Sequence, residues 1–331
     1  MMTEIKEYAP VMIPTLNRYE HFKRCLESLE KCTGADKTDV YVGLDYPPSD
    51  KYVEGWKKID EYLKEKETHH HFRNLFVRRR QQNCGVGGPK GNGSMLIREI
   101  GTKYDCFIST EDDNELSPNF LEYINKCLSR FKDDDRIIKV CGYNFVMDFP
   151  EMYRNNFYLS KVGSAWGTGT WINKHKLMSK YYDFNYLRDL VRNDNTYYLM
   201  MRRNKECINY ILRMLKKKQI HGDGIWEIYC ALEDKYIILP TKSKTRNFGV
   251  DGTGVHSLKL DEDMKRFYST QEIDTDKTFD FTDDIFTYPL YINDRTFKEK
   301  ITAKLLYKRF ILKIDTFLLR KFNYIPTSKF F

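Results

Sequence analysis

Three adjacent carboxylates, Glu111, Asp112 and Asp113, stand directly behind an apolar segment of this 331-residue chain. Neighbouring carboxylates repel one another unless a cation or hydrogen-bond donors compensate their charge. Divalent cations such as Mg²⁺ take oxygen ligands, and Mg²⁺ commonly uses one or two carboxylates together with phosphate oxygens. The spacing therefore indicates a cation-binding turn at the end of a strand, with a solvated acidic turn as the alternative.

A glycine-rich segment at residues 83–93 reads NCGVGGPKGNG. Ser94 stands where the pattern GxxxxGK[ST] requires lysine, and the glycine spacing also departs from GxGxxG. The segment is therefore no standard phosphate loop. Its glycines still permit close approach of the backbone to a ligand, and Lys90 is placed to face a phosphate.

Two polar stretches follow in the second half of the chain. Asp223 lies in Gly222-Asp223-Gly224-Ile225-Trp226-Glu227, before an apolar helix. Because glycines flank Asp223, we interpret it as poorly placed for a helix cap and well placed as a loop-borne general base. A glycine-rich loop at residues 245–252 follows an apolar strand, and His256 beyond it is either a ligand or an ordinary loop residue.

Strands and helices must alternate to position these residues. Five apolar segments are predicted to be strands, at residues 9–16, 39–44, 74–78, 105–110 and 136–143. Between them lie helical stretches such as 17–31, in which Phe22, Leu26 and Leu29 recur at spacings of four and three. The alternation predicts an α/β fold, with a mainly parallel sheet flanked by helices.

Polar side chains follow four of the predicted strands, at the point where each strand ends. They are Thr15, Asn17 and Arg18, then Asp45, then Asn83, and finally the acidic turn 111–113. Ligands of parallel sheets bind beyond the carboxyl ends of the strands. Since four separate strands deliver polar groups to one edge, we expect a single binding site there.

The charge of the chain is unevenly distributed. The whole chain has a formal net charge of +8, yet residues 1–294 contain 45 basic and 45 acidic residues. The last 37 residues contain ten Lys or Arg and two Asp or Glu, so they carry the entire excess. This distribution argues against nucleic acid as a partner of the main domain, whose surface would then carry the positive charge.

The basic tail at residues 295–331 is predicted to be an amphipathic helix. Leu305, Leu312 and Leu319 recur every seven residues, with Lys and Arg on both sides of the apolar stripe. Such a helix can lie on an anionic membrane surface. The alternatives are packing on the main domain and pairing in a homodimer. No apolar run has the length of about 18 residues that a spanning helix requires.

The eight cysteines form no CxxC pair and have no zinc-ligand spacing. The N-terminus lacks the apolar core of a secretory signal. We therefore expect reduced thiols in a cytoplasmic protein, which the tail would hold peripherally at the inner face of the membrane.

Over about residues 8–258 the sequence resembles GT-A glycosyltransferases of family 2. The resemblance begins with Pro14-Thr15-Leu16-Asn17-Arg18 after the first strand. The segment from Asn83 to Gly93 is similar to N-x-G-x-x-x-A-R-N-x-G, with Lys90 in place of the arginine and Gly91 in place of the asparagine. The E-D-D stretch at 110–120 resembles the corresponding motif of N-acetylglucosaminyltransferase I, of family 13.

The second half of the chain continues the resemblance. Residues 163–171 are similar to the acceptor-side segment G-W-G-x-x-x-W of bacterial relatives. Asp223-Gly-Ile-Trp226 matches their D-x-x-W element. Residues 243–256 match their S-x-x-x-N-x-G-x-D-x-T-x-H loop, with one extra residue before the histidine.

The resemblance implies a GT-A, Rossmann-like fold and an inverting, divalent-metal-dependent glycosyltransferase. The donor would be a nucleotide-sugar, usually a UDP-sugar, and the enzyme a hexosyl- or N-acetylhexosaminyltransferase. The acceptor would be a glycan or a lipid-linked sugar, as in bacterial surface polysaccharide synthesis. Mn²⁺ or Mg²⁺ would bridge the diphosphate and stabilise the leaving UDP.

Each candidate residue receives a role from this resemblance. Asp113 would bind the cation, with His256 completing its shell, and Asp223 would be the catalytic base. Trp166 and Trp226 would stack on sugars of the acceptor side. The donor site would be formed by Thr15, Asn17 and Arg18 beside the nucleotide, Asp45 at the uracil N–H, Asn83 and Lys90 at the glycine-rich segment, and Glu111 and Asp112 around the metal waters and donor sugar.

The domain organisation follows from the same motifs. We expect a GT-A domain at residues 1–294, with a nucleotide half at about 8–145 and an acceptor half at about 146–294, followed by the tail. Two other functions stay open: a catalytically inactive nucleotide-sugar-binding module, and a sugar-nucleotide nucleotidyltransferase. The latter class carries a glycine-rich loop directly after the first strand, where this chain has TLNRYEHF.

Overall fold

The computed structural model describes residues 5, 7–145, 149, 151, 153–251, 253, 271–282 and 303–326. Its centre is an eight-stranded sheet of order β3-β2-β1-β4-β8-β6-β9-β7. The strands are β1 Val11–Thr15, β2 Asp39–Leu44, β3 Asn74–Arg79, β4 Cys106–Ser109, β6 Ile137–Cys141, β7 Phe157–Ser160, β8 Thr168–Trp171 and β9 Tyr236–Pro240. A separate antiparallel pair joins β5 Asn114–Leu116 to β10 Thr245–Asn247.

The sheet is mainly parallel, as the sequence predicts. Strands β3, β2, β1 and β4 are parallel neighbours, and β9 is parallel to β6, while β8 and β7 run antiparallel to the strands beside them. Val11, Ile13, Val40 and Val42 are fully buried, which fits central parallel strands covered on both faces. All five predicted strands exist, with ends that differ by a few residues.

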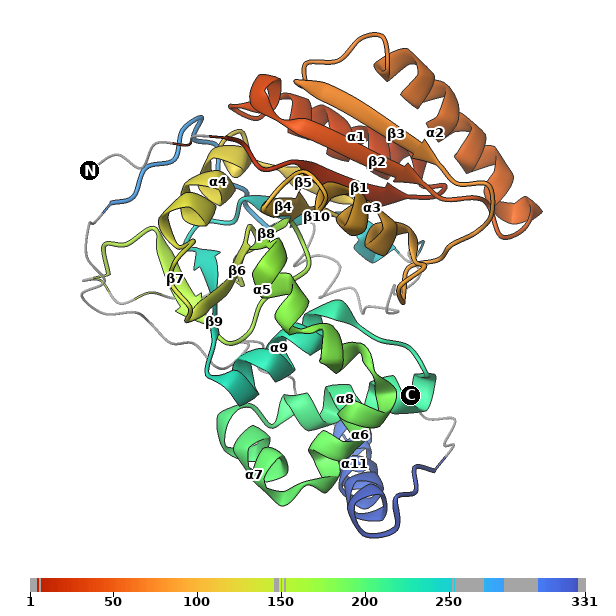
Figure 1. Ribbon diagram of the computed structural model, residues 1–331, viewed down its shortest axis with the longest axis vertical. Helices are drawn as coiled ribbons and strands as arrows, with labels where there is room; N and C mark the ends of the chain where they lie inside the picture. The colour runs from red at the N-terminus through yellow and green to blue at the C-terminus, as the bar shows by residue number, and fades with distance from the viewer. Residues whose placement is uncertain are drawn as a thin grey trace.

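Helices cover both faces of the parallel half of the sheet (Figure 1). On one face lie α1 Tyr19–Glu30, α2 Val53–Lys66 and α4 Phe120–Arg130, whose apolar side chains join the main core. On the other face α3 Asn92–Ile100 packs Leu96 and Ile100 against Met12 and Tyr41 of β1 and β2. The acidic turn 111–113 follows the carboxyl end of β4, beside the carboxyl end of its parallel neighbour β1.

A group of helices extends from the mixed half of the sheet, which contains β8, β6, β9 and β7 (Figure 1). It comprises α6 Phe184–Arg192, α7 Asp194–Arg203, α8 Glu206–Lys217, α9 Gly222–Glu233 and α11 Ala303–Phe322, which pack around a second apolar core. The short α5 Ile172–Leu177 connects the sheet to this group, and 3₁₀ turns occur at η1 Ala35–Lys37, η2 Asp50–Tyr52, η3 Ser179–Tyr182 and η4 Gly249–Asp251.

The basic tail forms helix α11, and one face of α11 packs on the other helices. Leu312 and Leu319 are buried in the second core, against α6 and α8. Asp315 makes an ion pair with Lys216 of α8, and both side chains are almost fully buried. Among the helices that the structure describes, none has the length and apolarity needed to cross a bilayer.

The eight cysteines are free thiols in the structure, and six of them are buried. Burial raises the pKa of the Cys106 thiol to about 11 and that of Cys141 to about 11. A thiol with such a pKa stays protonated at neutral pH, so these side chains behave as small core residues.

Candidate active site at the carboxyl ends of the strands

The acidic turn Glu111-Asp112-Asp113 follows β4 directly and leads into β5. Donors from the end of β1 compensate two of its charges. Thr15 Oγ1 donates to Asp112 Oδ2 at 2.8 Å, and Arg18 forms ion pairs with both Asp112 and Asp113, the latter at 2.7 Å. Thr15 and Arg18, which the sequence assigns to a nucleotide, therefore also hold the carboxylates in place.

Asp113 is fixed from the opposite side by the segment that follows β10. Asn247 Nδ2 donates to Asp113 Oδ1 at 2.7 Å, and the Phe248 N–H donates to the Asp113 carbonyl at 2.9 Å. A Cβ atom on Gly249 would lie 2.0 Å from Asp113 Oδ2, so a side chain at this position would displace the Asp113 carboxylate. Three distant segments thus converge on one carboxylate, and the sequence did not single out Asn247 or Gly249 beyond their place in the loop motif.

Glu111 has the most strongly perturbed carboxylate of the turn. Its side chain is solvent-exposed, yet many protein atoms surround its carboxyl group and reduce its solvation. Desolvation and then the negative charges of Asp113, Asp223 and Asp112 raise the pKa of Glu111 to about 8. Asp223, from a distant part of the chain, is therefore near enough to the acidic turn for its charge to affect Glu111.

Asp223 lies in the first turn of α9, and the expectation of a loop-borne residue is wrong. The helix already begins at Gly222, and Asp223 Oδ1 accepts a hydrogen bond from the Gly224 N–H at 2.9 Å. A carboxylate is favourable in the first turn because the helix dipole is positive there. Trp226 follows three residues later and therefore lies on the same side of the helix.

Lys139 is a buried cation next to Asp223 and Trp226. It lies on β6, its Nζ is 3.3 Å from the centre of the Trp226 ring, and it donates to Thr168 Oγ1 at 3.3 Å. Burial lowers the pKa of Lys139 to about 7, and the charge of Asp223 opposes this shift. Sequence reasoning missed this residue, although a lysine inside the apolar run IIKVC is a detectable signal.

Tyr182 and Trp166 add aromatic surface to this part of the molecule. Tyr182 lies in turn η3. Burial raises the pKa of Tyr182, and the negative charge of Asp223 adds to this shift. Trp166 is half-buried with its ring 4.6 Å from that of Tyr143, and its carbonyl accepts from Thr245 Oγ1 at 3.1 Å. The structure thus places Trp226 beside Asp223 and Trp166 beside β10.

Asp45 anchors the glycine-rich segment. Its two carboxylate oxygens accept hydrogen bonds from the Cys84 and Gly85 N–H groups at 2.8 Å, the Tyr46 N–H at 2.9 Å and Asn83 Nδ2 at 3.3 Å. Asn83 also donates to the Tyr46 carbonyl at 2.7 Å. The sequence did not predict these hydrogen bonds of Asp45 and Asn83. The contact of Asp45 with a uracil N–H stays a prediction.

Asn17 and Lys90 are the remaining residues predicted for the donor site. Asn17 follows β1, and Lys90 lies in the glycine-rich segment between β3 and α3. Asn17 is half-buried, and its carbonyl approaches Gly55 of α2 so closely that a Cβ there would be 2.0 Å away. Lys90 is exposed in the glycine-rich segment and lines a hollow of about 430 Å³ with Arg80 and Arg98. His256, the second metal-ligand prediction, lies outside the described residues.

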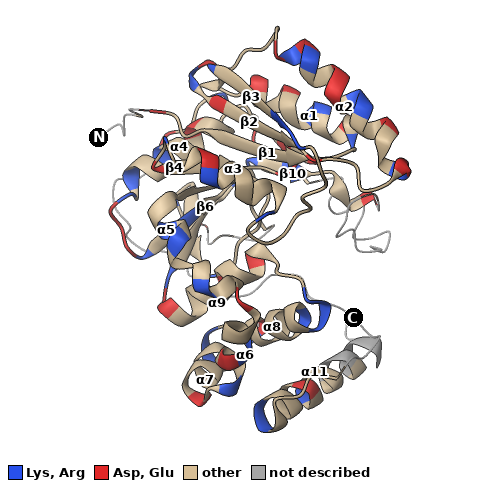
Figure 2. Ribbon diagram, turned by 45° about the vertical axis from the view of Figure 1, so that its right-hand side comes forward, with Lys and Arg blue, Asp and Glu red and all other residues tan. Residues whose placement is uncertain are grey.

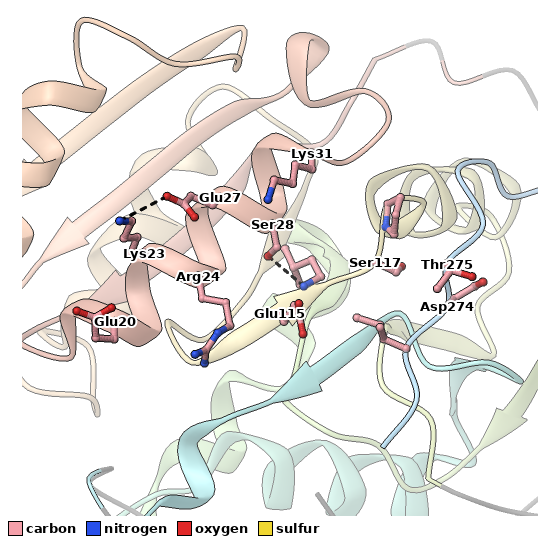
Figure 3. Close-up of a pocket in the computed structure, with 13 residues that line it drawn as sticks. Glu20, Lys23, Arg24, Glu27, Ser28, Lys31, Glu115, Ser117, Asp274 and Thr275 are labelled. Atoms are coloured by element: carbon pink, nitrogen blue, oxygen red, sulfur yellow. Dashed lines mark hydrogen bonds and ion pairs between the residues drawn. The ribbon is translucent and has the colours of Figure 1, made fainter. Parts of the chain in front are cut away.

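Another hollow, of about 470 Å³, lies between α1, β5 and residues 273–275 (Figure 3). The side chains around it include Glu20, Arg24, Glu27 and Glu115. It contains none of the residues that the sequence assigned to catalysis or donor binding. We therefore place the candidate site at the acidic turn and not in this hollow.

The donor set of the acidic turn fits a divalent cation that also binds phosphate. Within the described part of the chain, no three His, Cys, Asp or Glu side chains are arranged as a protein-only metal centre. At the turn, the carboxylates of Asp112 and Asp113 share the guanidinium of Arg18, so negative charge exceeds positive. An oxygen-rich site with surplus negative charge suits Mg²⁺ or Mn²⁺ that takes its other ligands from a diphosphate and water.

Comparison with known proteins gives matches among solved structures only. No protein-family model and no curated protein matches the chain. Similar solved structures include residues 1–349 of S. aureus TarS, with 13% identity, a TM-score of 0.36 and coverage of 68% of this chain and 81% of that chain. Mouse xyloside xylosyltransferase 1 in its apo form has 7% identity, a TM-score of 0.35 and coverage of 68% and 81%.

Two longer proteins are matched over part of their length. The apo WbbM bifunctional glycosyltransferase has 10% identity, a TM-score of 0.34 and coverage of 69% of this chain and 37% of that chain. A longer S. aureus TarS structure has 15% identity, a TM-score of 0.34 and coverage of 52% and 30%. This chain therefore spans less than half the length of either protein.

Proposed function

We propose that the chain is a GT-A-type glycosyltransferase that transfers a sugar from a nucleotide-sugar to an acceptor hydroxyl with inversion. One observation carries the proposal: Thr15, Arg18 and Asn247 hold the carboxylates of the acidic turn at the end of β4, and Asp223 is near enough for its charge to add to the raised pKa of Glu111. Inverting transfer needs one group of carboxylates for the donor diphosphate and a separate carboxylate for the acceptor. We assign the first task to the acidic turn and the second to Asp223.

On the donor side, Asp113 is the proposed ligand of the divalent cation. Asn247 and Arg18 fix its carboxylate, which keeps one oxygen ligand in a constant position at the end of β4. A bound Mn²⁺ or Mg²⁺ would supply Lewis-acid stabilisation of the diphosphate that leaves. Arg18 brings a second positive charge to the same place, and Glu111 and Asp112 orient the groups around it.

On the acceptor side, Asp223 is the proposed general base. Its carboxylate takes the proton of the acceptor hydroxyl while the hydroxyl oxygen forms a bond to the anomeric carbon. The bond from that carbon to the diphosphate oxygen breaks, and the nucleoside diphosphate leaves with the bonding electrons. Because attack and departure occur on opposite faces of the sugar, the anomeric configuration inverts.

Aromatic side chains complete the acceptor side of the proposal. Trp226 lies one turn from Asp223, and its ring is held by Lys139. Trp166 is held between Tyr143 and Thr245. Large rigid rings bind the apolar faces of sugars without a large loss of side-chain entropy. We assign both to the acceptor, a glycan or lipid-linked sugar.

The proposal is tested by measuring release of nucleoside diphosphate from a panel of UDP- and other nucleotide-sugars with Mn²⁺. We expect turnover with at least one donor, and at least an hundredfold loss for Asp113→Asn, about 3 kcal/mol of lost stabilisation. Asp189→Asn, on the exposed side of α6, is the matched control and keeps wild-type rates. Full turnover by Asp113→Asn would remove the cation role.

If no turnover is found, melting temperatures distinguish a binding module from a protein that binds no donor. If nucleotide-sugars raise the melting temperature only with Mn²⁺ but no donor is hydrolysed or transferred, the chain is a binding module. Equal melting temperatures with and without every donor would remove both functions.

A further inference from the structure

Helix α11 has two apolar faces, and the neighbouring helices α6 and α8 cover one of them. Leu312 and Leu319 are buried against the helical group. On the opposite side, Tyr307, Phe310, Ile314 and Phe317 are 53%, 59%, 38% and 54% exposed. These four recur at spacings of three and four residues and so form one continuous stripe. We call this stripe the aromatic face of α11.

The orientation of the aromatic face is fixed by polar contacts on the covered side. Asp315 pairs with Lys216 in a nearly dry environment. Arg320 donates to the Val191 carbonyl at 2.8 Å and forms an ion pair with Asp194. Since turning the helix would break this buried ion pair, the contact opposes an inward turn of the aromatic face.

The exposed aromatic surface extends beyond α11 itself. Phe322 and Tyr324 follow the stripe and are 61% and 56% exposed. On α7, Tyr198 is 63% exposed, and Arg320 of α11 lies 5.7 Å from the centre of its ring. The exposed aromatic residues therefore come from two elements that are far apart in the sequence. They form a larger apolar patch than the single apolar residues that are scattered over an ordinary protein surface.

Positive charge accompanies these rings. Lys313 and Lys321 are exposed on α11, and Lys321 Nζ lies 5.6 Å from the centres of both Phe317 and Phe322. Residues 184–218, which form the neighbouring helices, contain nine Lys or Arg and three Asp or Glu. The blue segments of α6, α7, α8 and α11 in Figure 2 show this excess around the helical group.

We propose that the aromatic face of α11 docks on a bilayer that contains anionic lipid. Phenylalanine and tyrosine partition to the headgroup level, and exposed lysines add attraction to anionic headgroups. A second copy of this chain is disfavoured, because two tails of net charge +8 would be brought together. The inference goes beyond the proposed transfer reaction and does not depend on it.

The test is sedimentation of the full chain with vesicles of phosphatidylcholine alone or mixed with phosphatidylglycerol. We expect binding to the anionic vesicles that weakens as salt rises. Phe310→Ser combined with Phe317→Ser should weaken it about tenfold or more, because each removes exposed apolar area from the contact. Leu177→Ser, at a 57% exposed position on α5, is the matched control and binds as wild type does.

A second variant tests the charge separately. Lys313→Glu combined with Lys321→Glu should weaken binding to anionic vesicles about tenfold or more while leaving the melting temperature unchanged, since both side chains are exposed. Either of two results overturns the proposal: no vesicle binding by wild type, or binding by both double variants that is as tight as that of wild type. A dimer in light scattering that dissociates in Phe310→Ser/Phe317→Ser would also overturn it, by making a second copy the occupant.

Discussion

At the scale of residues, the candidate site depends on pairings that join distant parts of the chain. Thr15 at the end of β1 and Arg18 just before α1 contact Asp112 because β1 and β4 are neighbours in the sheet. The sequence indicated that adjacent carboxylates need compensating donors, and it identified the acidic turn. It could not assign the donors, since the pairing depends on which strands become neighbours and not on local spacing.

Lys139 gives a prediction for the pH dependence of stability. Its folded pKa of about 7 lies below the ordinary value of 10.5, so between these pH values the unfolded chain binds more protons. The free energy of unfolding must therefore rise with pH across this window, by on the order of 1–4 kcal/mol. Lys139→Met keeps the apolar stem, lacks the titration, and should flatten the curve.

Thermal unfolding of both proteins between about pH 7 and pH 10 measures this effect. We expect the melting temperature of Lys139→Met relative to wild type to be highest near the lower end of the window. Parallel curves for the two proteins would show that the Lys139 amine is not shifted by burial. Lys205→Met, at an exposed position before α8, serves as the control with no change in slope.

At the scale of elements, long periodic segments were predicted well and short ones were not. Residues 9–16 and 17–31 correspond to β1 and α1 within a few residues, because burial of one apolar set dominates their conformation. The three-residue strands β5 and β10 are too short for any periodicity. Asp223 was expected in a loop because Gly222 and Gly224 flank it, yet tertiary packing carries α9 through both glycines.

The docking of α11 is the element-level interaction that is easiest to break. Asp315→Ala should destabilise the helical group by roughly 3–5 kcal/mol, because it removes the carboxylate that pairs with the buried Lys216 ammonium. Lys216→Met combined with Asp315→Leu should cost much less, since no buried charge remains. Thermal unfolding of the two variants separates these cases, and equal destabilisation by both would contradict an ion pair of this kind.

At the scale of the whole molecule, the chain combines a neutral body with a basic end. The sequence predicted this asymmetry and the α/β fold of the body, because charge and hydrophobic periodicity are additive over long segments. It left open whether the tail packs on the protein or faces a membrane. The structure resolves this in favour of one packed face on α11 and one exposed face, a distinction that only neighbouring helices could make.

The two halves of the sheet also explain why the candidate site needs the complete body. The acidic turn belongs to the parallel half, while Asp223 belongs to α9, beyond the mixed half that contains β8, β6, β9 and β7 (Figure 1). Lys139 on β6 contacts Trp226 and so connects α9 to the mixed half. Donor binding and acceptor activation are thus assigned to different parts of the molecule. A substitution can therefore remove acceptor activation while donor binding is kept.

The central claim, that the acidic turn holds the donor while Asp223 activates the acceptor, is tested most directly with Asp223→Asn. Donor binding with Mn²⁺ is measured by calorimetry and sugar transfer by product formation, on the same preparation. The account predicts a donor Kd close to wild type and a loss of transfer of about a hundredfold or more. Undiminished transfer by Asp223→Asn, or loss of donor binding in step with transfer, would contradict it.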